Sequence, residues 1–304
     1  MASRLWEGRG DVALMTTSAV RRSPLLPMLT VAVIAALLYL PLMVWANYGP
    51  AARSLASGAD LGCPTALACA TQLRNPVLPS PGQLANGFKA LSLPPTSPLS
   101  APYNALVTGG ETLLGLALAV LVGLGLAVLL VASRSFERAT LPWLVASQTV
   151  PIVAIAPMLA VLLGQYGVQG FLPKAIIAAF IAFFPIAVGM SRGLRSPDAL
   201  QLDLMHTYSA SSGQTFRLLR FPASLPYLFT ALKVAATAAL VGSIVAEIST
   251  ISFSGLGKML AENSRASDTI ALWVIMIYGA VLGVALVGLI GLAERILTPW
   301  KARA

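Results

Sequence analysis

The stretch LLGLALAVLVGLGLAVLL, residues 113–130, has no charged or polar side chain over 18 consecutive positions. A helix needs about 20 apolar residues, at about 1.5 Å per residue, to cross the hydrocarbon core of a bilayer. In lipid the backbone must satisfy its own hydrogen bonds, so a spanning segment of this kind is predicted to be a helix. Its glycines either allow another helix to approach closely or are simply tolerated in a membrane helix.

The composition of the whole chain indicates a membrane protein. Of the 304 residues, 57% are hydrophobic and 10% are charged, and the mean hydropathy is +0.81. A soluble globular protein carries about 25% charged residues, so this chain has too little polar surface to coat a water-soluble body. The net charge of +9 would suit nucleic acid, but most Lys and Arg residues flank apolar segments. That pattern favours a lipid bilayer as the partner and excludes nucleic acid.

Five further stretches are long and apolar enough to cross a bilayer, which predicts an all-α polytopic protein with six transmembrane helices. The predicted spans are residues 27–47, 107–132, 141–164, 173–191, 225–247 and 269–293. Residues 1–26 then form an N-terminal segment, 107–293 a core of five spans, and 294–304 a C-terminal tail. The apolar run at 25–46 is longer than the core of a cleaved signal peptide, which favours a retained signal anchor.

The distribution of positive charge predicts the orientation of the spans. With the N-terminus inside, the inner segments carry thirteen Lys and Arg residues and the outer segments carry six. Because short cytoplasmic loops carry such an excess, both termini are predicted to be cytoplasmic, with the protein in the inner membrane of the cell.

The predicted outer segment 48–106 is long and rich in Pro and Ser, and it holds Cys63 and Cys69, the two cysteines of the chain. An oxidising compartment would permit a disulfide between them, and two free thiols in a loop are the alternative. In either case the cysteines are expected to be structural, because no His lies near them in the sequence to form a catalytic pair.

The sequence carries no motif for catalysis or for nucleotide binding. It contains no G-x-x-x-x-G-K-[ST], G-x-S-x-G or H-E-x-x-H pattern and a single His, so no enzymatic activity, cofactor or metal site is expected. Glu111 and Glu247 are acids within predicted spans, and such acids mark ion paths in ion-coupled secondary transporters. Both are expected to be solvated near span ends, which counts against this function, and ion-coupled secondary transport is kept as the alternative.

A polar segment, residues 193–224, separates the fourth and fifth predicted spans on the inner side. Residues 198–212 are predicted to form a helix, with Asp198 in its first turn and Gly213 as its C-terminal stop. QTFRLLRF (214–221) is predicted to form a second short helix that ends at Pro222. These helices could lie in the membrane interface, cap the bundle, or dock in a groove of a partner protein.

This segment resembles the cytoplasmic EAA loop of ABC-importer permeases. Asp203 stands at the acid position of that pattern, Leu204 and Met205 at its two alanines, and Ser209 at its glycine. The two alanines and the glycine of the pattern are thus replaced in this chain. Further positions that fall in register are Ala210, Phe216 and the pair Phe221–Pro222.

Other segments between residues 76 and 295 resemble the nitrate/sulfonate/taurine/thiamine-precursor class of these permeases. The resembling segments are LPSPGQL (78–84), TVPIVAIAPMLAVLLG (149–164), FFPIAVGMSRGLRSPD (183–198), LPYLFTALKVAATAALVGSIVAEI (225–248) and GLG (255–257). The resemblance implies a type I ABC-importer bundle. Its solute would be a thiamine-pyrimidine precursor or related vitamin, with sulfonate, taurine and nitrate as open alternatives.

The resemblance also implies partners and sites. The partners would be a cytoplasmic ABC ATPase subunit that hydrolyses ATP, an extracytoplasmic solute-binding protein and a second permease copy. The residues expected to couple to the ATPase are Asp203, Leu204, Met205, Ser209, Ala210, Phe216, Arg217, Arg220 and Pro222. Candidates for the pore or gate are Gln148, Thr149, Pro151, Pro157, Ser243 and Glu247, whose polar groups could instead bond to their own helices.

Overall fold

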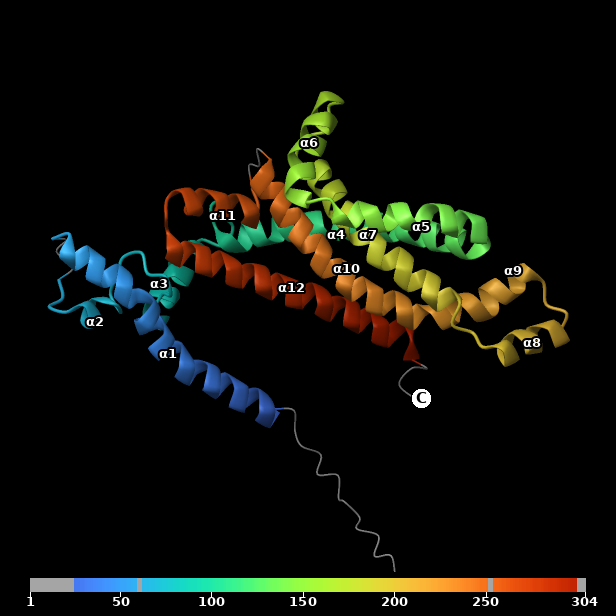
Figure 1. The fold of residues 1–304 in the computed structure, drawn as a ribbon, viewed down its shortest axis with the longest axis horizontal. Helices are drawn as coiled ribbons and strands as arrows, with labels where there is room; N and C mark the ends of the chain where they lie inside the picture. Colours follow the sequence, from blue (N-terminus) through green and yellow to red (C-terminus); the bar gives the residue numbers. More distant parts are fainter. Residues whose placement is uncertain (1–24, 59–61, 251–253, 300–304) are drawn as a thin grey trace, which may run out of the picture. The chain divides into compact units, whose positions relative to one another are not determined.

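The computed structural model describes residues 25–58, 62–250 and 254–299, and every regular element in these ranges is a helix (Figure 1). The prediction of an all-α fold is confirmed. The chain divides into two compact units, residues 1–70 and 71–304. The first unit holds α1 (Leu25–Ala56) and α2 (Ala66–Cys69). The second holds α3 (Pro81–Ser92), α4 (Ala101–Ala132), α5 (Arg134–Thr149), α6 (Ile152–Gln165), α7 (Phe171–Leu194), α8 (Ala199–Thr207), α9 (Ser212–Thr215), α10 (Phe221–Ser249), α11 (Leu256–Arg265) and α12 (Thr269–Leu297).

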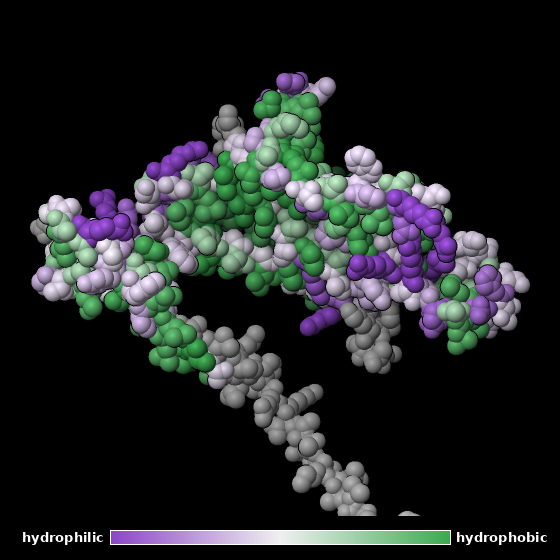
Figure 2. All heavy atoms as spheres, viewed as in Figure 1, coloured by the Kyte–Doolittle hydropathy of each residue, from purple (hydrophilic) through white to green (hydrophobic). Residues whose placement is uncertain are grey.

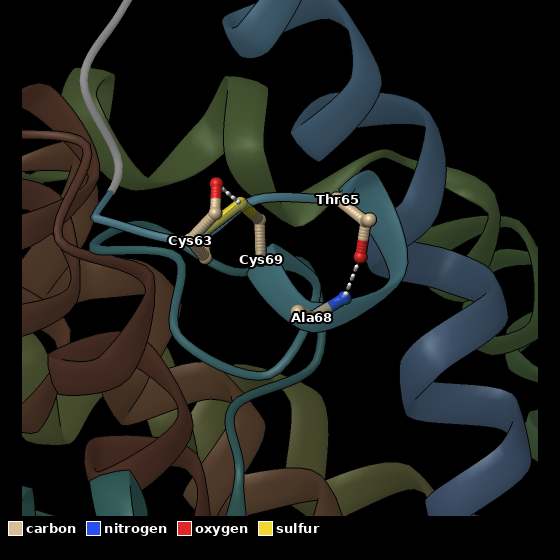
Figure 3. Close-up of a disulfide and its surroundings, with 4 residues drawn as sticks. All are labelled: Cys63, Thr65, Ala68 and Cys69. Carbon is tan, nitrogen blue, oxygen red and sulfur yellow. Dashed lines mark hydrogen bonds between the residues drawn. A yellow bond between two sulfur atoms is a disulfide. The ribbon is translucent and has the colours of Figure 1, made fainter.

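In the first unit, a disulfide joins Cys63 to Cys69, whose Cα atoms are 5.5 Å apart (Figure 3). Between them, Thr65 caps the short helix α2 by accepting a hydrogen bond from the Ala68 N–H (3.3 Å). The disulfide therefore closes a small loop that also has its own helix cap.

The helix α1 continues past the predicted end of the first span. It ends at Ala56, so the first part of the predicted outer segment 48–106 is helical. The buried side chain of Asn47 on α1 donates a hydrogen bond to the carbonyl of Ala70 (3.0 Å). This bond ties the chain after the disulfide loop back to α1. The N-terminal segment predicted at 1–26 lies almost wholly outside the described residues.

In the second unit, α3 begins at the segment LPSPGQL with a capping box. The Ser80 hydroxyl accepts from the Gln83 N–H (3.3 Å), and the Gln83 side chain accepts from the Ser80 N–H (2.8 Å). Pro81 follows at the first helical position, where its missing N–H costs nothing. The predicted outer segment thus contains a second helix, and α3 packs on α12 through Phe88 and Tyr278, whose rings are 5.7 Å apart.

The core of the second unit is α7, which packs against α4 on one side and α10 on the other. The contacts are made by small residues. A Cβ at Gly115 would lie 2.6 Å from the Cβ of Ala178, and one at Gly189 would lie 2.5 Å from the Cβ of Ala231. Both glycines are therefore needed for close helix approach. A Cβ at Gly125, in the same apolar stretch as Gly115, would meet nothing within 4 Å. Helix packing therefore does not require a glycine at this position.

Four continuous helices in the described residues are long and apolar enough to cross a membrane: α4, α7, the continuous helix Ser212–Ser249, and α12. On the visible face, hydrophobic residues cover the middle of α4, α10 and α12 (Figure 2). Hydrophilic residues gather over α11 and around the far end of α5 in the same view. This is the distribution expected of a polytopic membrane protein.

The span predicted at 141–164 is not one straight helix. It consists of α5 and α6, which are bent by 99° at the break between them. Val150 and Pro151 are extended at the break (ψ 125° and 118°), because a residue before proline avoids the helical region and proline has no N–H to continue the helix. Within the described residues, the core has five spans only if this bent pair counts as one.

The segment predicted to be a second short helix ending at Pro222 is instead continuous with the fifth span. After α9, residues Phe216–Arg220 form a π-helical turn that leads directly into α10. The wider turn accommodates Pro222, whose ring would otherwise meet the carbonyl of Leu218 four residues earlier. Proline therefore widens the helix here and does not end it.

Candidate coupling surface and buried polar cluster

The helix α8 is short and begins with a capping box. The Asp198 carboxylate accepts a hydrogen bond from the Gln201 N–H (2.8 Å), and the Gln201 side chain accepts from the Asp198 N–H (3.3 Å). An acid at this end also suits the helix dipole. The helix ends at Thr207, so the predicted helix over 198–212 was too long.

Ser209, not Gly213, stops this helix. Its φ is +52°, the left-handed conformation that usually takes glycine at the residue after a helix C-cap. Its N–H donates to the carbonyl of His206 (2.8 Å), and the Ala210 N–H donates to that of Met205 (3.0 Å). These are the two bonds of a Schellman motif. Ser209 thus takes the conformation expected of the glycine in the EAA pattern, whereas Gly213 lies within α9.

One face of α8 carries a row of exposed apolar side chains. Leu200, Leu204 and Tyr208 are four residues apart, hence on one helix face, and their exposed fractions are 78%, 55% and 76%. We call these three residues the α8 apolar row. The prediction named only Leu204, although the spacing of four was visible in the sequence.

The other predicted coupling residues differ in their surroundings. Phe216 is half-buried and packs against the core formed by α4, α7 and α10. The exposed members are Asp203, Ser209 and Arg217, and the half-buried ones are Met205, Ala210, Arg220 and Pro222. Because α8 and α9 lie next to each other beyond the ends of α7 and α10 (Figure 1), these residues lie together at one end of the unit. We call it the polar end, after its exposed residues Asp203, Ser209 and Arg217.

Arg195, which sequence reasoning did not single out, anchors the connection from α7 to α8. Its guanidinium donates to both carboxylate oxygens of Glu137 (2.7 and 2.8 Å) and to the carbonyl of Leu130 (2.9 Å). A bidentate pair of this kind has a fixed geometry. It joins the end of α7, just before α8, to the end of α4 and the start of α5.

Glu247 lies in a buried polar cluster between α4 and α10. Its Oε1 accepts a hydrogen bond from the Thr108 hydroxyl (2.7 Å), and its Oε2 accepts from the Gly257 N–H (2.5 Å). One turn earlier, the Thr112 hydroxyl donates to that of Ser243 (3.1 Å). All four of these side chains are buried. Their hydrogen bonds pair polar groups that would be costly to leave without a partner away from water.

The start of α11 completes this cluster. Three successive backbone N–H groups donate to side chains: Gly255 to Asn104 Oδ1 (2.6 Å), Leu256 to Thr108 Oγ1 (2.9 Å) and Gly257 to Glu247 Oε2 (2.5 Å). The first N–H groups of a helix lack partners within it, and its N-terminus favours negative charge. A Cβ at Gly255 or Gly257 would overlap the Glu247 carboxylate. The GLG segment therefore permits this contact.

Glu111 is also buried, and it pairs with Lys174 on α7 at 2.6 Å. The expectation that Glu111 and Glu247 would be solvated at span ends is wrong, because Lys174 and the start of α11 cover them. The signal that was missed is a polar row in one apolar helix: Asn104, Thr108 and Thr112 recur every four residues of α4, and Glu111 is three residues after Thr108.

The predicted pore residues fall in three places. Gln148, Thr149 and Pro151 are exposed at the bend between α5 and α6. Pro157 lines a cavity of about 540 Å³ between α4, α6, α7 and the end of α10, which Glu111 and Lys174 also line. Ser243 and Glu247 belong to the buried cluster, with exposed fractions of 0% and 1%.

Sequence comparisons relate the chain to known transport proteins. Residues 119–303 match the family described as binding-protein-dependent transport system inner membrane component. A formylaminopyrimidine transport permease of Halalkalibacterium halodurans is 32% identical over 62% of this chain and 74% of its own. A riboflavin transport system permease of Chloroflexus aurantiacus is 33% identical over 56% of this chain and 61% of its own. A putative aliphatic sulfonates transport permease of Bacillus subtilis is 26% identical over 70% of this chain and 79% of its own.

Solved structures show the same fold. The inward-facing MetNI methionine ABC transporter matches with a TM-score of 0.53 and 20% identity, over 64% of this chain and 93% of that chain. An amino acid ABC transporter crystallised with histidines matches with a TM-score of 0.52 and 18% identity, over 64% and 92%. The family match covers more than half of the chain, and the fold agrees with it. The chain belongs to the binding-protein-dependent transport system inner membrane components, as an ABC-importer permease of the nitrate, sulfonate and thiamine-precursor class.

Proposed function

We propose that this chain is the permease subunit of an ATP-driven importer and that α8 is its coupling helix, seated on a cytoplasmic ABC ATPase subunit. The observation that carries the proposal is the α8 apolar row. Leu200, Leu204 and Tyr208 are exposed at the polar end of the unit, where Arg217 and Asp203 are exposed too. An apolar helix face in polar surroundings is the form in which a helix docks in a groove of another protein.

The surroundings of α8 suit transmission of movement. The end of α7 that leads into α8 is anchored by the pair of Arg195 with Glu137, and the end of α8 is fixed by the turn at Ser209. The residue Phe216 then packs into the core. The apolar row would supply affinity, and Asp203, Arg217 and Arg220 would set the register on the ATPase. A rigid-body shift of the ATPase could thus move α7 and α10 together.

The complete importer would hold two copies of this permease, ATPase subunits that hydrolyse ATP, and an extracytoplasmic solute-binding protein. Both termini and α8 would be cytoplasmic, as the excess of inner Lys and Arg predicts. The permease copies would alternate between inward- and outward-facing states. Cys63 and Cys69 would then lie in the oxidising outer compartment, which suits a disulfide.

The solute would be a thiamine-pyrimidine precursor or a related vitamin, in line with the relatives named for formylaminopyrimidine and riboflavin transport. Sulfonate, taurine or nitrate are the other candidates, since relatives are also named for sulfonates and nitrate. The cavity lined by Pro157 is the candidate for part of the path, together with the bend that holds Gln148, Thr149 and Pro151.

The buried acids favour one other function, ion-coupled secondary transport. Glu111 and Glu247 lie inside the helical core as such a transporter would require. Their contacts, however, have a structural explanation: Glu111 pairs with Lys174, and Glu247 caps α11. Uptake into proteoliposomes driven by a proton or sodium gradient without ATP would favour this second function.

The test is binding of the ATPase subunit to purified permease carrying Leu200→Ala, Leu204→Ala and Tyr208→Ala together. We expect the affinity to fall at least about tenfold, because a buried anchor residue is worth about 1–2 kcal/mol. Leu99→Ala is the matched control, since Leu99 is 80% exposed outside the polar end. Equal affinity of the triple variant and the Leu99→Ala variant would refute docking through α8.

A further inference from the structure

A second cavity, of about 780 Å³, lies between α10 and α12 near the C-terminal end of α12. It is lined by Lys233 of α10 and by residues of α12, including Gly288, Gly291 and Arg295. None of these residues belongs to the coupling surface or to the buried cluster. The cavity lies within the last turns of an apolar span, so it is at the level where the helix leaves the hydrocarbon core.

The charged side chains of the cavity wall come from both helices. The Lys233 ammonium contacts Glu294 at 2.5 Å, and its side chain remains 36% exposed. An ammonium group has three N–H donors, so one ion pair leaves donors that can face the cavity. Arg295 is exposed, and it forms no ion pair with any acid in the described residues 25–58, 62–250 and 254–299. The wall therefore has a net positive charge of one.

Another part of the cavity lining, on α12, is apolar and open. A Cβ at Gly288 would meet nothing within 4 Å, and one at Gly291 would meet only the aliphatic Lys233 Cε at 3.9 Å. Leu292 also lines the cavity. Two glycines one turn apart leave a notch in the helix surface, beside which a hydrocarbon chain can lie.

We infer that this cavity binds the phosphate headgroup of an anionic phospholipid of the inner leaflet, with an acyl chain in the glycine notch. Lys233 and Arg295 would donate to the phosphate, and Glu294 would hold the Lys233 ammonium in place. A phosphodiester carries one negative charge, which matches the net charge of the wall. Basic pockets between membrane helices on the cytoplasmic side bind such headgroups. The assignment of the lipid to the inner leaflet rests on the topology given under the proposed function. The binding of an anionic phospholipid in this cavity does not.

The experiment is native mass spectrometry of the full chain, purified in detergent and mixed with phosphatidylglycerol or with phosphatidylcholine. The wild-type chain is expected to retain phosphatidylglycerol at least about tenfold more strongly than phosphatidylcholine. Arg295→Gln removes one cation and is expected to reduce this preference at least about threefold. Gly288→Leu fills the notch and is expected to reduce the retention of phosphatidylglycerol at least about threefold, because the acyl chain loses its place. Both changes lie at positions free of internal packing, so the fold should persist.

Two matched controls accompany these variants. Arg138→Gln removes an exposed cation from the same predicted side, and Gly125→Leu fills an equally open position on α4. Both should keep the wild-type preference and the wild-type retention of phosphatidylglycerol. Equal retention of the two lipids, or equal loss in variants and controls, overturns the site. Displacement of phosphatidylglycerol by an equal concentration of inorganic phosphate also overturns it, because it would show a site for the free anion. Binding of the ATPase subunit is measured in a separate experiment. The proposed lipid site and the proposed coupling role of α8 can therefore fail independently of each other.

Discussion

At the residue scale, Ser209 decides where α8 ends. A side chain in the left-handed region costs roughly 1–2 kcal/mol relative to the right-handed one, and Ser209 adopts it with φ at +52°. The two Schellman bonds to His206 and Met205 compensate for part of that cost. The orientation of α8 relative to α9 therefore depends on one strained residue.

Ser209→Pro is expected to lower the affinity for the ATPase subunit by about tenfold or more. Proline cannot reach a positive φ, and it removes the N–H that bonds to His206. Ser212→Pro, three residues later, is the control. Ser212 is the first residue of α9, and Ser211 before it is already extended (ψ 161°). Binding measured by surface plasmon resonance should separate the two variants, and an equal effect would show that the turn at Ser209 is not needed.

At the scale of elements, α11 is held by side chains of other helices. Asn104 and Thr108 of α4 and Glu247 of α10 take up its first N–H groups. The helix has ten residues, too few to be stable alone in water. Its position must therefore come from these contacts and from the apolar packing of Leu256 and Met259.

Gly257→Ala is expected to destabilise the purified permease by about 1–3 kcal/mol, because the added Cβ would overlap Glu247 and the carbonyl of Ile244. The measurement is the thermal unfolding midpoint in detergent. Gly125→Ala is the control, since Gly125 lies in α4 with open space around it and alanine favours a helix. A midpoint for Gly257→Ala as high as that of Gly125→Ala would contradict the proposed importance of the cap.

At the scale of the whole molecule, the proposed topology places α8 and α11 on opposite sides of the membrane. The continuous helix Ser212–Ser249 separates them, and it is long and apolar enough to cross a bilayer. The α8 side is predicted to be cytoplasmic by its excess of Lys and Arg. The cavity lined by Pro157 would then open toward the side from which the solute arrives.

A membrane-impermeant maleimide should label Ser212→Cys in inside-out vesicles only and Ser264→Cys in right-side-out vesicles only. Both positions are exposed, and the background is Cys63→Ser with Cys69→Ser. The readout is the mass shift of the labelled chain. Labelling of both positions from one side would show that the helix Ser212–Ser249 does not span the membrane. Reversed labelling would refute the cytoplasmic placement of α8.

The sequence was sufficient for features that depend on local chemistry. The apolar length of α4, α7 and α12 predicted helices that can span a bilayer, and Asp198 was expected at the start of α8, where it forms the cap. It failed at Pro151 and Pro222, because proline can break, widen or kink a helix. Which outcome occurs depends on the residues packed around it.

What the sequence determined by itself is the membrane class, the all-α fold and the family, because apolar length, charge distribution and family motifs can be read along the chain. Only the tertiary structure decided that Glu111 and Glu247 are buried, that α11 is capped from two other helices, and that Ser209 takes a glycine conformation. For the buried acids, the physical reason is that their partners can lie far away in the sequence: Glu111 and Lys174 are 63 positions apart, and Thr108 and Glu247 are 139 apart. No local pattern specifies those pairs before the helices pack. The turn at Ser209 is local, but serine has no intrinsic preference for a positive φ that would indicate it.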